Sequence, residues 1–196
     1  IEEIPETIHE AMRQLRTGRS RPVEIEIPPD VLAATADLDI LEPSIGSKPA
    51  ADIQEIEAAC KLLADSNRPV IFAGGGVNLA NASQELQQVV ELLNAPVITT
   101  TEGRGAISDA HPLAMGISRS FGTTSIAGQV IGNADVILAV GTRFSDATTA
   151  DWAPKQSQKV IRLDIDPDEI NRVLTPTTTL LGDAKATLQR LTETLK

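Results

Sequence analysis

Glycines follow two apolar segments of this sequence, in a pattern typical of loops that approach a phosphate group. Gly74, Gly75 and Gly76 end the run "PVIFAGGG", and Gly141 ends "VILAVG". Glycine lets a backbone approach a ligand closely, and free amides at the start of a following helix favour an anion such as pyrophosphate. The run "GGGVNL" lacks the fixed glycine spacing of the strict dinucleotide fingerprint. A tight turn between a strand and a helix therefore explains the triple glycine equally well.

Charged side chains near these bends could bind the rest of a nucleotide. Arg143 follows Gly141 by two residues, and a guanidinium group can grip a phosphate through two hydrogen bonds. A surface salt bridge is the ordinary role of an isolated arginine, but the position beside Gly141 favours ligand contact. Asp164 ends the run "KVIRLD" and could accept hydrogen bonds from a ribose or an adenine amine. Helix capping is the stronger explanation for Asp166 and Asp183.

The sequence shows no set of residues that would perform catalysis. Its two histidines, His9 and His111, lie far apart, and its one cysteine, Cys60, excludes a site of two histidines and two cysteines. Cys60 falls on the apolar face of a predicted helix, which indicates a buried, inert thiol. A stand-alone NAD-dependent oxidoreductase is disfavoured, because "PVITTTEG" offers threonines where an acidic residue is expected after the second strand. The pattern is that of a binding fold.

Short apolar runs alternate with segments of helical spacing in the larger, C-terminal part of the chain. Strands are expected at residues 68–73, 95–100, 111–115, 135–140, 159–165 and 177–183. Helices are expected at residues 53–63, 86–93, 123–134, 166–174 and after Asp183. Because strands joined by crossover helices run parallel, the fold class predicted is α/β. The expected form is a doubly wound, mainly parallel six-stranded sheet with helices on both faces, a Rossmann-like domain.

In such a sheet, ligands bind beyond the carboxyl ends of the strands, where the strand order reverses. If the strands that end at Gly74 and Gly141 are neighbours at this point, both bends border one crevice. The pattern therefore predicts a nucleotide-facing site between them.

The N-terminal part follows a different pattern and indicates a separate domain. Residues 4–17 repeat apolar side chains at helical spacing, and Val23, Ile25 and Ile27 alternate with glutamates as in a half-exposed strand. Residues 33–51 lack a sustained period and contain prolines and a glycine. The predicted organisation is therefore a remnant of a preceding domain at 1–32, a linker at 33–51 and a main domain at 52–196.

Composition narrows the function classes. The 196 residues carry a formal net charge of −10, which disfavours nucleic-acid binding. No apolar run approaches the roughly 20 residues that span a bilayer. The single cysteine excludes a disulfide within the chain and favours a reducing, cytoplasmic location. The first residue is Ile1, so we expect an excised piece of a longer protein.

Several strings together resemble a known family. "RPVIFAGGGV", "APVITTTEGRGAISDAHPLAMG", "NADVILAVGTRFSD" and "KVIRLDIDPDEINR" followed by "LLGDA" occur in this order. They resemble the central domain of thiamine-diphosphate-dependent enzymes of the acetolactate synthase type, over about residues 52–196. The stretch "IHEAMRQLRTGRSRPVEIEIPPDVL" looks like the closing helix and strand of that family's pyrimidine-binding domain.

The resemblance implies a parent enzyme, a carboligase or decarboxylase (an acetolactate-synthase-like transferase) acting on 2-oxo acids. Its thiamine diphosphate and Mg²⁺ would be held by segments outside this chain, so the fragment alone should be inactive. Flanking catalytic domains and a homo-oligomer are implied as partners. The central domain would hold FAD or an ADP-like nucleotide. The residues implied as its contacts are Gly74, Gly75, Gly76, Thr100, Thr101, Gly141, Thr142, Arg143, Asp146, Asp164, Ile165, Asp183 and Ala184.

Two positions depart from the FAD-binding members of the family. Those members carry an arginine immediately after the position of Asp146, where this chain has Ala147. They also carry a glycine-methionine-histidine-glycine pattern where this chain reads "MGISRSFG". The alternative is a structural or oligomerisation domain that binds no nucleotide.

Overall fold

The computed structural model describes residues 1–44, 46–118, 125–145 and 154–196. The chain divides into two compact units, Ile1–Lys48 and Pro49–Lys196. Between α2 and Pro49, the described residues form no helix or strand.

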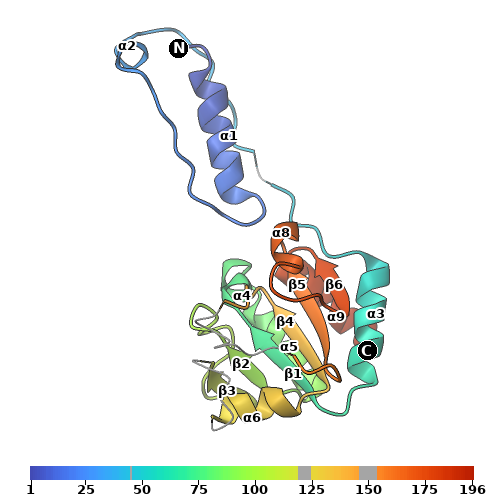
Figure 1. Ribbon diagram of the computed structural model, residues 1–196. Helices are drawn as coiled ribbons and strands as arrows, with labels where there is room; N and C mark the ends of the chain where they lie inside the picture. Colours follow the sequence, from blue (N-terminus) through green and yellow to red (C-terminus); the bar gives the residue numbers. More distant parts are fainter. Residues whose placement is uncertain (45, 119–124, 146–153) are drawn as a thin grey trace. The chain divides into compact units, whose positions relative to one another are not determined.

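The larger unit is built on one parallel sheet of six strands (Figure 1). The strands are β1 (Pro69–Ala73), β2 (Val97–Thr99), β3 (Ala114–Ile117), β4 (Val136–Val140), β5 (Lys159–Asp164) and β6 (Thr178–Leu181). Their order is β3-β2-β1-β4-β5-β6, so the direction of winding reverses between β1 and β4. The prediction of a doubly wound parallel sheet is confirmed.

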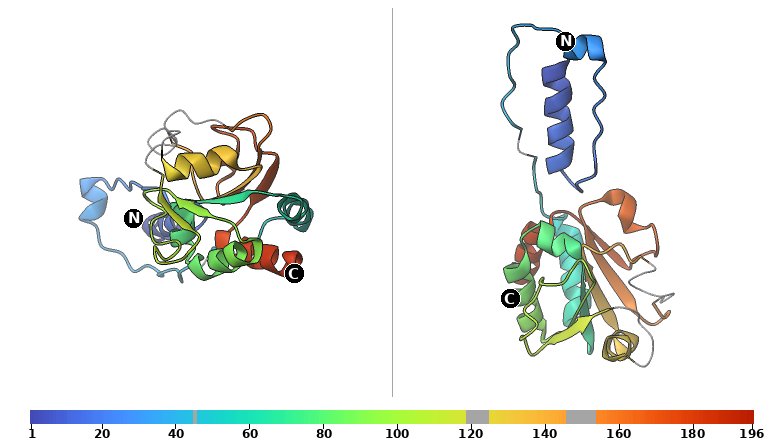
Figure 2. Two further views of the ribbon diagram at one scale, coloured as in Figure 1. Left: turned by 90° about the horizontal axis from the view of Figure 1, so that it is seen from below. Right: turned by 90° about the vertical axis from the view of Figure 1, so that its left-hand side faces the viewer.

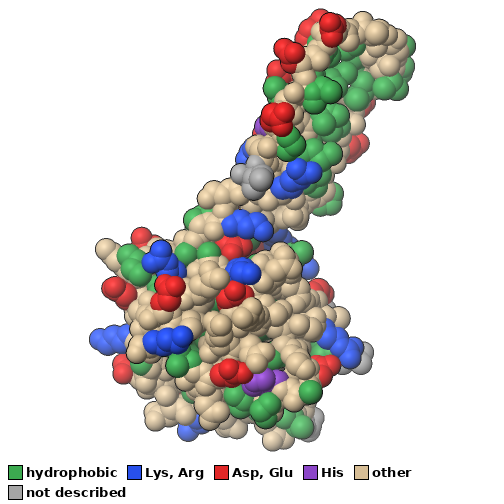
Figure 3. All heavy atoms as spheres, turned by 180° about the vertical axis from the view of Figure 1, so that it is seen from behind, with side chains coloured by type: hydrophobic (Ala, Val, Ile, Leu, Met, Phe, Trp, Pro, Cys, Tyr) green, Lys and Arg blue, Asp and Glu red, His purple; other side chains and the backbone are tan. Residues whose placement is uncertain are grey.

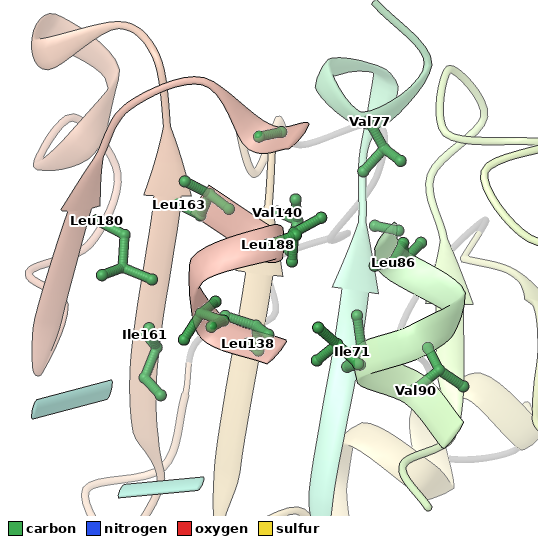
Figure 4. Close-up of a cluster of buried hydrophobic side chains, with 14 of the residues drawn as sticks. Ile71, Val77, Leu86, Val90, Leu138, Val140, Ile161, Leu163, Leu180 and Leu188 are labelled. Carbon is green, nitrogen blue, oxygen red and sulfur yellow. The ribbon is translucent and has the colours of Figure 1, made fainter. Parts of the chain in front are cut away.

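Helices cover both faces of the sheet (Figure 2). They are α3 (Ile53–Ala64), α4 (Gly75–Leu79), α5 (Ser83–Leu93), α6 (Ile126–Asn133), α8 (Pro167–Ile170) and α9 (Ala184–Leu195). Helices α3, α5 and α9 pack on one face, where Leu86 and Leu188 meet Ile71 and Leu138 (Figure 4). Helix α6 packs on the other face. Burying each large aliphatic side chain contributes about 1.5–3 kcal/mol, so these layers hold the strands together.

The two faces differ in the chemistry of their cores. The hydrophobic cluster under α3, α5 and α9 is aliphatic apart from Cys60, and α9 also buries Thr187. The other face combines Ile131 of α6 with two aromatic rings, those of Phe72 and Phe144. Arg162 is also buried, at a position in β5 that alternates with Ile161 and Leu163 of the aliphatic face. This second face lies beside the bend that follows β4.

Side-chain caps fix the starts of α3 and α9. Asp52 accepts a hydrogen bond from the backbone N–H of Gln54 at 2.8 Å, and Asp183 accepts one from that of Ala186 at 3.0 Å. Such caps satisfy amides that have no partner within the helix. The predicted cap at Asp166 is confirmed, but the helix predicted over 166–174 ends at Ile170. Its last carbonyl, on Ile170, accepts a hydrogen bond from Arg162 Nη1 at 3.0 Å.

Two predicted strands differ in the structure. The third strand, predicted at 111–115, begins at Ala114, because His111 lies in a turn whose carbonyl accepts from the Ala114 N–H at 2.9 Å. The strand predicted at 23–27 is wrong, since residues 21–28 form neither helix nor strand. A strand needs a neighbour for its backbone hydrogen bonds, and the described residues of Ile1–Lys48 contain no strand that could provide one.

The N-terminal unit contains α1 (Ile4–Arg16) and α2 (Pro29–Leu32). Helix α1 is strongly amphipathic, yet Ile8, Met12 and Leu15 on its apolar side remain exposed. Figure 3 shows hydrophobic side chains gathered on this unit. None of the helices in the described residues has both the length and the apolar character needed to cross a membrane.

The half-buried carboxylate of Asp135 joins the start of β1 to the start of β4. The side chain of Asp135 accepts hydrogen bonds from Ser66 Oγ and from the backbone N–H groups of Asn67 at 2.8 Å and Arg68 at 3.0 Å. Burial raises the pKa of this carboxyl, but these hydrogen bonds together outweigh burial and lower the pKa to about 2. The carboxylate therefore stabilises the turn before β1 in its ionised form.

We predict that Asp135→Asn lowers the free energy of unfolding near neutral pH. Because the folded-state pKa of about 2 lies below the usual value of about 4, the stabilisation is present above about pH 4 and disappears as the pH falls toward 2. Urea unfolding of the wild type and of Asp135→Asn across this pH range measures the difference in the free energy of unfolding. The exposed Asp65→Asn is the matched control. A difference between wild type and Asp135→Asn that stays constant down to about pH 2 would contradict the assignment.

Candidate functional site

The bends after β1 and β4 touch each other through their backbones. The N–H of Gly74 donates to the Val140 carbonyl at 2.8 Å, and the N–H of Gly76 donates to the Gly141 carbonyl at 3.0 Å. A Cβ on Gly74 would lie 2.2 Å from the Gly141 oxygen, and a Cβ on Gly141 would lie 2.5 Å from Gly76 Cα. The expectation that the two bends are neighbours at the strand reversal is confirmed.

The glycines of the first bend have different roles. Among the glycines of the two bends, only Gly141 adopts a positive φ, at +56°. The amides of Gly74 and Gly76 are occupied by the β4 bend. Gly75 is the first residue of α4, where an amide has no acceptor within the helix. Close packing of two bends therefore accounts for Gly74 and Gly76, and Gly75 alone keeps an amide for another partner.

A third loop, after β2, joins this edge. Thr100 is buried, its N–H donates to the Ala73 carbonyl at 2.9 Å, and its Oγ1 accepts from the Gly103 N–H at 2.9 Å. Asn78 of α4 donates to the carbonyls of Glu102 at 2.9 Å and Arg104 at 3.0 Å. Thr100 thus stabilises the loop, whereas the neighbouring Thr101 is exposed.

The loop after β4 alternates buried and exposed side chains. Thr142 and Phe144 are buried, and the Phe144 N–H donates to Thr142 Oγ1 at 3.4 Å. Arg143 between them is exposed and has no hydrogen bond or ion pair with any described residue. No described residue therefore occupies its guanidinium. Asp146 and Ala147, and the central part of "MGISRSFG", lie outside the described residues.

The strands beyond β4 carry the remaining predicted contacts. Asp164 is buried at the end of β5, and its carboxylate accepts from the Asp166 N–H at 3.1 Å. The Gly182 N–H donates to the Asp164 carbonyl at 2.9 Å, which brings Asp183 and Ala184 to the same edge. The Asp183 side chain caps α9, with Ala184 buried as its first residue. Ile165, next to Asp164, is half-buried.

Arg162 is the main residue that sequence reasoning missed. It is fully buried, and its Nη2 donates to the Thr142 carbonyl at 3.0 Å. Its guanidinium carbon lies 5.2 Å from the centre of the Phe144 ring, within the range of a cation–π contact. Burial lowers its pKa, and the nearby carboxylates of Asp164 and Glu169 oppose this. An arginine inside the apolar run "KVIRLD" was the available sequence signal.

Within residues 1–44, 46–118, 125–145 and 154–196, no three side chains of His, Cys, Asp or Glu are arranged to hold a metal ion. Cys60 is buried on α3, and burial, assisted by the charge of Glu57, raises the pKa of its thiol to about 11. The predicted burial of this thiol is confirmed.

A surface pocket also occurs at the opposite, amino edge of the sheet. The ends of α3, α5 and α9 and the first residue of β1 line it, including Leu63, Pro69, Leu93 and Leu195. None of its lining residues carries a charged side chain. Nucleotide-binding chemistry is therefore better supported at the carboxyl edge, where Arg143 is exposed.

Comparison with known proteins identifies the family. Residues 56–191 match the family described as "Thiamine pyrophosphate enzyme, central domain". The chain belongs to this family. The resemblance noted in the sequence is thereby confirmed.

Among curated relatives, the chain is 40% identical to the "Probable acetolactate synthase large subunit" of Methanococcus aeolicus, with 98% of this chain and 33% of that protein aligned. It is 37% identical to the acetolactate synthase large subunit of Corynebacterium glutamicum, over 99% of this chain and 32% of that protein. It is equally identical, at 37%, to the glyoxylate carboligase of Escherichia coli O157:H7 over 97% of this chain and 32% of that protein. The chain thus spans about a third of the length of these relatives.

A solved structure from Mycobacterium smegmatis, described as a thiamin diphosphate-dependent enzyme, has the same fold. It superimposes with a TM-score of 0.79, at 22% sequence identity, over all of this chain and 38% of its own length. The likeness confirms the architecture.

The glycine contact yields a prediction about stability. We expect Gly141→Ala to lower the free energy of unfolding by about 2–4 kcal/mol, because the new Cβ both clashes and strains a left-handed backbone. Gly132→Ala is the control, since its Cβ would meet nothing within 4 Å in α6. We expect this control to stabilise by about 0.5–1 kcal/mol. Urea unfolding measures both, and equal effects would contradict the packing role of Gly141.

Proposed function

We propose that the carboxyl edge of the sheet binds the diphosphate-containing part of FAD or of an ADP-like nucleotide. The observation that carries this proposal is the exposed Arg143 beside the touching bends of β1 and β4. Anions bind where a cation and backbone amides converge. Arg143, Thr101 and the Gly75 amide supply such a donor set.

The remaining contacts follow the order of the strands. In the proposal, Gly74, Gly76, Gly141 and Thr142 border the diphosphate through their backbones. Thr100 and Thr101 lie beside the flavin arm, and Asp146 joins Arg143 near the ribityl-diphosphate region. The adenosine lies toward β5 and β6, where the contacts are Asp164, Ile165, Asp183 and Ala184.

We propose further that the chain serves within a larger thiamine-diphosphate-dependent enzyme acting on 2-oxo acids. The support is that the relatives include acetolactate synthases and a glyoxylate carboligase about three times its length. When bound, thiamine diphosphate supplies the electron sink that stabilises a carbanion; its Mg²⁺ and its contacts would lie outside this chain. The residues present here bind and position the nucleotide instead.

The N-terminal unit supports an assembly role. Ile8, Met12 and Leu15 of α1 are exposed although they form one apolar side of the helix, and such faces are usually buried against a partner. We propose that residues 1–32 close a preceding domain, that residues 33–51 link it to the nucleotide domain at 52–196, and that the full enzyme is a homo-oligomer. A scaffold without any nucleotide is the second candidate, because buried glycine contacts serve the fold equally well without a ligand.

Nucleotide binding is tested on Arg143. We expect ADP or FAD to raise the melting temperature in proportion to the logarithm of its concentration. Removing a charge-assisted hydrogen bond costs about 1.5–3 kcal/mol, so Arg143→Ala should weaken binding about tenfold or more. Arg190→Ala, on the exposed side of α9, is the control. If neither nucleotide stabilises the wild type, the scaffold is favoured.

The proposal that catalysis needs segments outside this chain is tested by an assay of turnover. We expect the 196-residue chain to form no acetolactate from pyruvate when thiamine diphosphate and Mg²⁺ are added, since the contacts of both are proposed to lie outside this chain. A complete acetolactate synthase large subunit is the positive control in the same colorimetric assay. Turnover by the chain alone would refute this assignment.

A further inference from the structure

Arg162 occupies an unusual place for an arginine. It lies in the middle of β5 and is fully buried. Arginine is seldom fully buried unless its charge is paired. Its two terminal nitrogens both donate to backbone carbonyls at 3.0 Å, Nη1 to Ile170 and Nη2 to Thr142. Among the described residues, its Nε has no partner. The side chain therefore joins the end of α8 to the loop after β4.

The loop that Arg162 contacts contains a conformation that costs energy. Phe144 has φ +51°, and a bulky residue in the left-handed region is a genuine outlier. Such a residue persists only where its surroundings fix it. The Phe144 ring packs against Phe72, with centroids 5.5 Å apart, and against the Arg162 guanidinium on β5. Phe144 is thus clamped between β1 and β5.

The clamp determines where Arg143 points. Arg143 lies between Thr142, whose carbonyl Arg162 holds, and Phe144, whose ring Arg162 covers. With both neighbours buried, the only side chain of this segment that faces solvent is the one proposed to grip the phosphate. The charged groups around Arg162 are Asp164, Glu169 and Arg172.

We propose that Arg162 is a positioning residue that holds Phe144 in its left-handed conformation and thereby presents Arg143 to the nucleotide. The effect on affinity rests on the proposed function, whereas the effect on the loop does not. Lysine cannot replace the guanidinium fully, because its single nitrogen cannot donate to two carbonyls in a fixed fork. The residue acts through Arg143 and does not contact the ligand itself.

Local proteolysis tests the positioning. In the 196-residue chain, trypsin can cut after Arg143 only when Phe144 leaves its clamp. We expect Arg162→Met to speed this cleavage about tenfold relative to cleavage after Lys61 in α3, because a local opening needs less energy than unfolding of the unit. Arg162→Lys should be intermediate. Arg172→Met, which removes only the ion pair with Glu169 at 2.7 Å, should leave the ratio unchanged. Because Arg162→Met removes the donors to the Thr142 and Ile170 carbonyls, circular dichroism first checks that this variant folds, and Arg162→Lys provides a second variant.

A double-mutant cycle tests the link to the ligand. With ADP as the probe, Arg162→Met should weaken binding about tenfold in the wild-type background and have no further effect in an Arg143→Ala background. The proposal is overturned if Arg162→Met weakens ADP binding equally in the wild-type and Arg143→Ala backgrounds. It is also overturned if Arg162→Met speeds cleavage after Arg143 and after Lys61 by the same factor. If wild type binds neither ADP nor FAD, the nucleotide function fails, and the cleavage ratio alone decides whether Arg162 positions the loop.

Discussion

The structure depends on the contact between two backbones at the strand reversal. Gly74, Gly76 and Gly141 lie so close that a Cβ on Gly74 or Gly141 would enter the space of the other bend. Because β1 and β4 are hydrogen-bonded along their whole length, their following bends must leave the sheet side by side. Without side chains there, two hydrogen bonds join the bends, and α4 can start at once. This contact sets the backbone surface that any ligand at the carboxyl edge would touch.

A second constraint comes from the unequal faces of the sheet. The core under α3, α5 and α9 is a cluster of aliphatic side chains, and the buried Thr187 of α9 accepts a hydrogen bond from the Ala51 N–H. On the other face, Phe72, Phe144 and Arg162 combine apolar packing with hydrogen bonds. Hydrogen bonds from a charged group are directional, and they fix the position of the backbone carbonyls that accept them. The chemically specific part of the core therefore lies directly beneath the loop that carries the exposed arginine.

The sequence predicted the features that depend on local pattern. Continuous apolar runs located β1, β4 and β5, and Asp183 marked the start of α9. The failures depend on contacts that a local pattern does not show. Residues 23–27 alternate like a strand but have no neighbouring strand in the described part of their unit. The helix after Asp166 stops at Ile170, whose carbonyl accepts a hydrogen bond from the buried side chain of Arg162 in the preceding strand. For the site, the sequence located the bends and Arg143 but could not show which amides were already occupied, since that depends on tertiary contact.

This distinction decides which residues carry functional information. Gly74, Gly76 and Thr100 are required by the fold itself, so they would be retained in a nucleotide-binding domain and in an empty scaffold alike. Arg143 and Thr101 differ, because their exposed side chains are not needed for packing. Within the described residues 142–144, the strained backbone of Phe144 accompanies a single exposed side chain, that of Arg143. Strained backbone conformations cluster at ligand sites, and this supports the proposal of a ligand at the carboxyl edge.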